Sequence, residues 1–291
     1  MPEAPVTVGV AGWTYEDWKG VVYPARTQDR LAFMADRLDC LEINSSFYKP
    51  FDERIARAWV QSVSHNPRFR FSAKVWSRLT HETDKPLDPA DIQTFLKGPA
   101  ALKSAGRLLS LLLQFPFYFK DTPSHRERLQ LLADGLRAFP TVLEVRDASW
   151  AQPQAIAFIH DLGLNIACLD MPLASDSFRL DAAATGPLGY LRLHGRNAPA
   201  WFKKDSERDD KYNYLYTPSE MDEIIQRIQR LRQNADAVAV VWNNHYRGKA
   251  AVNAFQTLHA LTGEKVAVPE TLQAAYPELM RIARTEKGML F

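Results

Sequence analysis

The chain has 291 residues, of which 46% are apolar and 24% are charged, and its formal net charge is +2. This length suits one α/β domain, and the nearly balanced charge gives no overall field of the kind that draws a protein to nucleic acid or to a membrane surface. Only Cys40 and Cys168 occur, both in apolar runs, which argues against a disulfide framework and predicts buried thiols.

Short apolar runs alternate with helical patterns along the chain. The predicted strands are residues 6–12, 40–44, 69–75, 108–114, 141–146, 165–170, 189–194 and 237–242. The sequence also predicts where several of the intervening helices begin. Helices are expected to start at Asp52 and Thr122, and the expected N-caps are Thr27, Asp88 and Thr217. The last of these is the strongest, because Thr217-Pro218-Ser219-Glu220 combines a cap, a proline at the first helical position and a capping-box glutamate.

Eight strands with about seven helices between them predict a single-domain TIM-like (β/α)8 barrel over residues 1–291. Two segments depart from the repeat. Residues 171–186 contain Pro172 and three small polar residues, so we expect an irregular crossover between strands six and seven. Residues 271–284 follow the last barrel helix and are expected to pack as an extra C-terminal helix.

The predicted strands run out into polar side chains. These residues are Glu42, Asn44, Lys74, Gln114, Glu144, Arg146, Asp170, Arg192, His194, Asn243 and Asn244. Parallel strands place their carboxyl ends at one end of a barrel, so we expect the polar ends to converge there. Alternation along a strand puts Glu42 with Asn44, Glu144 with Arg146, and Arg192 with His194, each pair directed toward the barrel axis.

Motifs along most of the chain resemble those of a known family. They are Gly12-Trp13-Thr14-Tyr15 with Trp18, Glu42-Ile43-Asn44-Ser45-Ser46-Phe47-Tyr48, Phe71-Ser72-Ala73-Lys74, Thr80-His81, Leu113-Gln114-Phe115-Pro116, Glu144-Val145-Arg146 with Ser149-Trp150, Arg192-Leu193-His194-Gly195-Arg196, Tyr212-Asn213-Tyr214-Leu215-Tyr216 and Asn243-Asn244. In this order they resemble the domain of unknown function 72 (YecE-like) family, and residues 171–186 match least well. The resemblance implies a TIM barrel, similar in outline to endonuclease IV and xylose isomerase, and no settled activity.

The ionisable residues predict an anion site in the bowl above the strand ends. Several fixed cations form a natural site for phosphate or carboxylate, and we expect Lys74, Arg146, Arg192 and Arg196 to clamp such a ligand. Glu42 and Glu144 are the acid/base candidates, and His194 is a candidate for proton transfer. We therefore expect an enzyme acting on a nucleotide, nucleic-acid fragment or sugar phosphate, with phosphoester chemistry ahead of sugar isomerisation.

Other side chains are expected to orient this ligand. The candidate binding residues beyond the clamp are Trp13, Tyr15, Asn44, Tyr48, His81, Gln114, Asp170, Tyr214, Asn243 and Asn244. Aromatic rings beside cations suit stacking on a base or a sugar face. The long segment 197–217 between the seventh strand and its helix is expected to act as a lid or binding element.

Several alternatives remain open from the sequence. No cofactor is predicted, although one Mg²⁺ or Mn²⁺ ion could bind the carboxylates. Lys74 could form a Schiff base if its neighbours depress its pKa, but nearby glutamates would keep it charged, so anion binding is its expected role. The bowl could also belong to a noncatalytic binding protein, or to a scaffold closed by its aromatic loops.

The N-terminal residues predict no targeting to a membrane. Met1 to Pro5 contain neither a basic start nor an apolar signal core. No apolar run approaches the ~20 residues of a membrane span. We therefore expect a cytoplasmic protein with no membrane partner and no evident protein partner.

Overall fold

Eight parallel strands close into one barrel in the computed structural model of the chain, which describes residues 3–181, 184–203, 205 and 208–284. Each strand pairs with the next, and β1 pairs with β8 to complete the ring. The strands are β1 Val6–Ala11, β2 Cys40–Ile43, β3 Arg70–Lys74, β4 Leu108–Gln114, β5 Thr141–Glu144, β6 Asn165–Asp170, β7 Leu188–Leu193 and β8 Ala237–Trp242. The predicted TIM-like barrel is confirmed.

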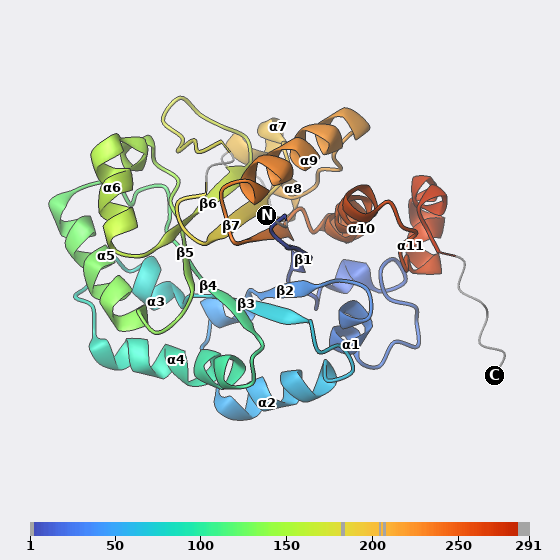
Figure 1. Cartoon of the computed structure of the whole chain (residues 1–291), viewed down its shortest axis with the longest axis horizontal. Coiled ribbons are helices and arrows are strands. Elements are labelled where there is room, and N and C mark those ends of the chain that lie inside the picture. Colours follow the sequence, from blue (N-terminus) through green and yellow to red (C-terminus); the bar gives the residue numbers. More distant parts are fainter. Residues whose placement is uncertain (1–2, 182–183, 204, 206–207, 285–291) are drawn as a thin grey trace.

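Helices surround the strands, as Figure 1 shows. The main ones are α1 Arg30–Ala35, α2 Glu53–Ser62, α4 Pro89–Ser104, α5 Pro123–Leu136, α6 Pro153–Asp161, α9 Pro218–Arg232 and α10 Lys249–Thr262. Among the described residues none of the helices is long and apolar enough to cross a membrane.

Four of the five predicted helix starts are confirmed by capping hydrogen bonds. The N-caps of these four helices are Asp52, Asp88, Thr122 and Thr217, the last with its full capping box. Thr27 is wrong as the cap of α1. Asp29 caps that helix, its carboxylate accepting a hydrogen bond from the Ala32 amide at 2.9 Å. Asp29 lies two residues after Thr27, and a carboxylate accepts the hydrogen bond of a free helix amide as well as a hydroxyl does.

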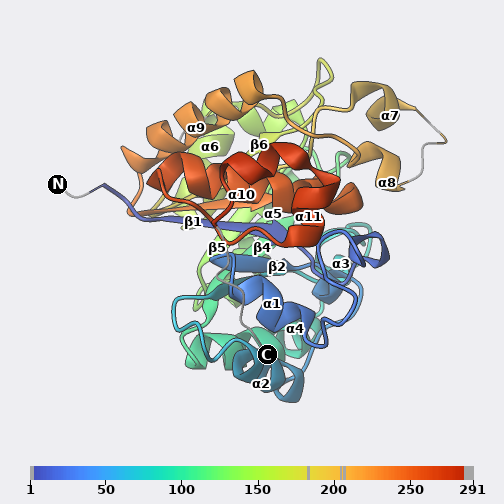
Figure 2. The ribbon, with the colours of Figure 1, turned by 90° about the vertical axis from the view of Figure 1, so that its right-hand side faces the viewer.

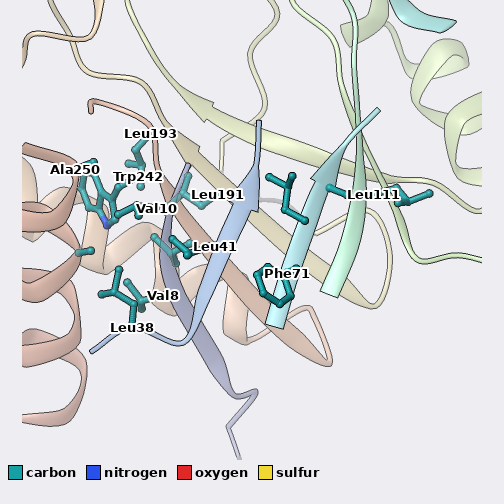
Figure 3. Packing of buried hydrophobic residues seen from close by; sticks show 14 of the residues in the cluster. Val8, Val10, Leu38, Leu41, Phe71, Leu111, Leu191, Leu193, Trp242 and Ala250 are labelled. Atoms are coloured by element: carbon teal, nitrogen blue, oxygen red, sulfur yellow. The ribbon is translucent and has the colours of Figure 1, made fainter. Parts of the chain in front are cut away.

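Side-chain alternation divides the buried residues into two layers. Residues such as Val8, Val10, Leu41 and Trp242 are fully buried and belong to the large cluster between strands and helices. Figure 3 shows Val10 and Trp242 directed toward the helix that carries Ala250. A second, smaller cluster fills the barrel axis. Its buried members are Ala11, Leu112, Val142, Ala167, Tyr190, Ala239 and Val241.

The long segment after β7 is not a plain loop. It contains two short helices, α7 Ala198–Phe202 and α8 Arg208–Lys211. Figure 2 shows both projecting from the same end of the molecule as α3 Ser77–Thr80, the short helix that follows β3. The segment therefore lies at the carboxyl ends of the strands, where a binding element was expected.

The two irregular segments differ in outcome. The described residues of the crossover 171–186 contain no helix and no strand, as predicted, and residues 182 and 183 of that prediction lie outside the described part. The C-terminal tail is not one helix. It divides into α11 Glu270–Ala275 and a 3-10 helix, Pro277–Arg281, because Pro277 excludes helical backbone at Tyr276, whose φ and ψ are −135° and 81°. Cys40 and Cys168 are both buried, as expected, and neither forms a disulfide bond with another described residue.

Candidate functional site

A pocket of about 390 Å³ lies at the carboxyl ends of the strands. Most of its lining is polar or aromatic. The lining residues are Asn44, Phe47, Tyr48, Lys74, His81, Gln114, Pro116, Phe117, Arg146, Arg192, Tyr212, Asn243 and His245. Eight of them belong to the expected binding set, and they come from six of the eight strand ends. The predicted convergence is therefore present in the structure.

Arg192 holds two buried glutamates at the base of this pocket. Its Nη2 donates to Glu42 Oε1 at 2.7 Å and its Nε to Glu42 Oε2 at 3.1 Å, while its Nη1 donates to Glu144 Oε2 at 2.9 Å. The three side chains are 0–3% exposed. Burial alone would raise the pKa of Glu144, but the positive charges of Arg192 and Arg146 together outweigh it and hold that pKa well below its usual range. Glu144 is therefore a carboxylate at neutral pH.

Beneath the ion pairs lies a hydroxyl chain that the sequence interpretation missed. Tyr190 donates a hydrogen bond from its hydroxyl to Glu42 Oε2 at 3.0 Å, and the same hydroxyl lies 3.3 Å from Ser72 Oγ. Ser72 and Ser110 share a further bond of 2.8 Å. Tyr190 is two residues before Arg192, so strand alternation could have placed it on the barrel axis.

His194 is a buried neutral imidazole beside Arg192. Burial and the neighbouring guanidinium lower its pKa well below the usual range. Arg192 Nη1 lies 3.3 Å from His194 Nε2, and a guanidinium can only donate, so Nε2 accepts. The other ring nitrogen, Nδ1, lies 3.1 Å from Asn243 Nδ2. His194 thus connects the ion pairs to a residue that lines the pocket.

Lys74 is the cation of the pocket that forms no ion pair with any carboxylate in the described part of the chain. Its Nζ lies 4.0 Å from the ring centroid of Phe47. The described residues give it neither a hydrogen bond nor an ion pair within 4.0 Å. Burial and the charge of Arg192 lower the pKa of Lys74 to about 7, although Glu144 and Glu42 act in the opposite direction. The expectation that the glutamates keep this lysine fully charged is not supported.

Arg146 joins this pocket to a second, largely apolar one. Its Nε and Nη2 donate to Glu144 Oε1 at 3.2 and 3.0 Å. It also lines a neighbouring pocket of about 320 Å³, together with Phe117, which both pockets share. The other residues of the second pocket include Phe178 and Trp201.

We call the set Glu42, Lys74, Glu144, Arg146 and Arg192 the mouth cluster.

Asp170 and Arg196 form a separate group outside the pocket, although the sequence predicted both as ligand contacts. Arg196 donates two hydrogen bonds of 2.9 Å to Asp170, and Arg227 of α9 donates one of 2.8 Å. Tyr216 adds a hydrogen bond of 2.6 Å to the same carboxylate. We call Asp170, Arg196, Arg227 and Tyr216 the outer cluster; it fastens β6 and the segment after β7 to α9.

Four further predicted contacts also lie outside the pocket lining. Trp13 packs edge-on against Trp59 of α2 at 5.6 Å, and Tyr15 donates to the Ala11 carbonyl at 2.7 Å. Tyr214 donates to Glu220 Oε1 at 2.6 Å. Asn244 donates from Nδ2 to the Tyr214 carbonyl, on the outer side of β8. These residues shape the loops around the pocket rather than its wall.

Four aromatic residues line the pocket that were not among the expected contacts of the ligand, namely Phe47, Phe117, Tyr212 and His245. Tyr212 comes from the segment after β7, and His245 follows β8 and stacks on Tyr15 at 4.3 Å. His81, which was expected, lies in the lining with its ring edge-on to Phe47 at 4.7 Å. Burial and the charge of Lys74 lower the pKa of His81 to about 4, so this ring is neutral at physiological pH.

The described residues contain no group of three or more His, Cys, Asp or Glu side chains arranged to hold a metal ion. Glu42 and Glu144 instead direct their oxygens to guanidinium groups. A divalent ion at these carboxylates would have to displace Arg192.

Solved structures share this architecture. A DUF72 family protein of Thermotoga maritima superposes with a TM-score of 0.78 at 28% identity, over 88% of this chain and 99% of that chain. One of Enterococcus faecalis gives 0.79 at 26% identity, over 88% and 95% of the two chains. A xylose isomerase domain-containing protein of Salmonella typhimurium matches at 0.50 with 12% identity, over 89% of this chain and 99% of that one, which is a likeness of fold alone.

The sequence comparisons agree with the structural ones. The UPF0759 protein YunF of Bacillus subtilis is 27% identical over 271 residues, covering 88% of this chain and 94% of that protein. Residues 7–277 match the family described as "Protein of unknown function DUF72". With this match over most of its length, the chain belongs to the DUF72 family.

Proposed function

We propose that the pocket of about 390 Å³ beside the mouth cluster, from here on the mouth pocket, binds a small anionic ligand. This ligand would also carry hydroxyl groups, as a sugar phosphate or part of a nucleotide does. The observation that supports this most is the charge of the mouth cluster. Two carboxylates, Glu42 and Glu144, are taken up by Arg192 and Arg146, and Lys74 remains without a carboxylate partner among the described residues. The protonated cluster therefore has one positive charge in excess inside a partly buried pocket.

The polar lining suits the remainder of such a ligand. The amides of Asn44, Gln114 and Asn243 lie around the same pocket and can donate to hydroxyl or phosphate oxygens. The Nη1 of Arg146 donates no hydrogen bond to any described residue, since the bonds of Arg146 to Glu144 use Nε and Nη2. A second donor for the anion is thus present beside Lys74.

The glutamates fit a counterion role better than an acid/base role. Catalytic acids and bases need a pKa displaced toward neutrality, whereas the pKa of Glu144 lies well below its usual range. Paired Glu–Arg contacts of this kind favour a binding site. The pocket also argues against a closed scaffold, because a cavity of about 390 Å³ remains among the aromatic loops.

Thermal unfolding with matched ligands tests this proposal. Glycerol 3-phosphate should stabilise the wild-type protein and glycerol should not, because a ligand stabilises the native state in proportion to its occupancy. Lys74→Met should weaken glycerol 3-phosphate binding by about tenfold to a hundredfold, since a hydrogen bond to a charged group contributes ~1.5–3 kcal/mol. Lys97→Met, on the exposed face of α4, is the control and should bind like wild type. Equal binding by both variants would refute the proposal.

A further inference from the structure

Lys74 differs from every other cation of the mouth cluster in what surrounds its charged group. Arg192 and Arg146 are tied to glutamates through hydrogen bonds of 2.7–3.2 Å. The Lys74 ammonium instead meets the Phe47 ring at 4.0 Å, and the described residues offer it no acceptor. Lys74 lines the pocket at the end of β3, where its side chain can meet a ligand.

Burial of Lys74, aided by the neighbouring guanidinium groups, favours its neutral amine form over the effect of the two glutamates. Burial and the Arg192 guanidinium bring the pKa of this lysine to about 7, against 10.5 for an ordinary lysine. About half of the molecules would then carry a free amine at neutral pH, compared with about one in three thousand for an ordinary lysine. A desolvated lysine beside another cation is the usual arrangement for a lysine nucleophile.

We propose that Lys74 forms a Schiff base with a small aldehyde or ketone that carries a phosphate or carboxylate group. This rests on the proposed anion site, and it names the ligand class more narrowly. The anionic group of the substrate would bind Arg146, whose Nη1 has no protein acceptor among the described residues. The carbonyl carbon would then meet the Lys74 nitrogen in the same pocket.

The reaction needs no oxidant, reductant or metal. The lone pair of the Lys74 nitrogen attacks the carbonyl carbon, and the electron pair of the C=O double bond moves to oxygen. The nitrogen gives up a proton and the oxygen gains one, which yields a carbinolamine. A second proton, taken up from solvent water, lets that oxygen leave as water while the nitrogen lone pair forms the C=N bond of the iminium ion.

His81 is placed to carry these protons. Its ring contacts the same Phe47 ring that Lys74 contacts, and both residues line the pocket. Its Nδ1 is bonded to Thr80 Oγ1 at 2.8 Å, which fixes the ring and leaves Nε2 for the ligand. As a neutral imidazole it can accept a proton from the attacking nitrogen and return it to the oxygen.

Reductive trapping tests the Schiff base. The wild-type protein is incubated at about pH 7 with glyceraldehyde 3-phosphate and sodium cyanoborohydride, which reduces an iminium ion to a stable secondary amine. Digestion and mass spectrometry then locate the adduct. We expect the Lys74 peptide to be modified at least about tenfold faster than the peptide with the exposed Lys97, because the free-amine fraction is far larger. Modification of Lys74 no faster than Lys97 overturns the proposal.

Lys74→Arg separates this inference from the proposed function. It retains a positive charge that cannot form a Schiff base, so it should still be stabilised by glycerol 3-phosphate but should show no adduct at position 74. Wild-type protein that binds glycerol 3-phosphate but shows no preferential adduct would refute the Schiff base and leave the anion site standing. Protein that neither binds nor traps would refute both. An uncharged aldehyde, propanal, should label Lys74 more slowly than the phosphorylated one.

Discussion

The mouth cluster and the outer cluster contain the same kinds of side chain but differ in how their charges are matched. In the outer cluster, Asp170 receives hydrogen bonds from Arg196, Arg227 and Tyr216, and the two arginines also form ion pairs with Glu220, Glu223 and Asp181, so each cation has carboxylate partners. In the mouth cluster, Lys74 has no carboxylate partner among the described residues. The first arrangement is a structural fastening, and the second leaves a reactive group beside a cavity. In this barrel, the unmatched charge supports the proposed ligand site better than the number of charges does.

The largest effect is expected where a matched charge is removed from the mouth cluster. Arg192→Met leaves Glu42 and Glu144 buried without their shared partner, which should lower the free energy of unfolding by about 3–5 kcal/mol. Urea denaturation measures this. Arg57→Met is the control, because its i,i+4 pair with Glu53 on α2 is exposed and should change stability by less than about 0.5 kcal/mol. Similar losses in both variants would contradict the view that Arg192 holds the glutamates.

Asp170→Asn tests whether the outer cluster is only structural. The amide keeps the shape but loses the charge between Arg196 and Arg227, so we expect a loss of about 2 kcal/mol in the free energy of unfolding. The affinity for glycerol 3-phosphate should stay within about twofold of wild type, because Asp170 does not line the mouth pocket. A much larger loss of affinity would show that the two clusters are not independent.

The pH dependence of stability tests the unmatched lysine. The pKa of Lys74 is about 7 when folded and 10.5 for the ordinary group, so between these values the unfolded chain binds more protons. The contribution of Lys74 to stability is therefore present above pH 10.5 and is lost as the pH falls through about 7. Relative to Lys74→Met, the wild-type protein should gain about 1 kcal/mol over this range, less than the full linkage value because the side chain is partly exposed.

A pH series of chemical denaturation on the two proteins measures this difference. Lys97→Met serves again as the reference, since an exposed lysine should give a difference that does not vary with pH. A constant difference between wild type and Lys74→Met would mean that the amine at position 74 titrates normally.

The smallest expected effect comes from the aromatic neighbour of Lys74. The Phe47 ring lies 4.0 Å from the ammonium and stabilises its charged form. Phe47→Leu removes about 0.5 kcal/mol of this attraction, which should lower the pKa of Lys74 by roughly 0.4 units. NMR titration of the ¹³C-dimethylated lysine measures the shift. A rise in the pKa would show that the ring acts by excluding water rather than through its face.

Strand alternation explains which site residues could be predicted. Glu42, Glu144, Arg192 and His194 all lie within or directly after regular strands, and the structure brings them together as expected. The prediction that Asp170 lies with them is wrong, and the same rule explains why. Ala167 lies in the axial cluster, so alternation along β6 puts Cys168 and Asp170 on the outer face. The apolar residue Cys168, two positions before Asp170, could therefore have predicted that Asp170 faces outward.

The loops beyond the strands could not be predicted in this way. Arg196 follows Gly195, whose φ of +92° turns the chain out of the strand direction. A Cβ atom at position 195 would also lie 2.7 Å from the Cβ of Tyr214, which is too close for any residue but glycine. No period along the sequence encodes such a turn. The sequence also could not predict that Lys74 lacks a carboxylate partner among the described residues, because this depends on which cation each glutamate contacts across the barrel.

The filled barrel axis fixes how a ligand travels. Among the described residues, Tyr190, Leu112 and Ala239 block the interior below the ion pairs of Arg192, so there is no passage through the far end. Whatever enters at the mouth must leave by the same opening. Two ligands of this pocket would therefore exclude each other, and a titration with both present should show competitive binding.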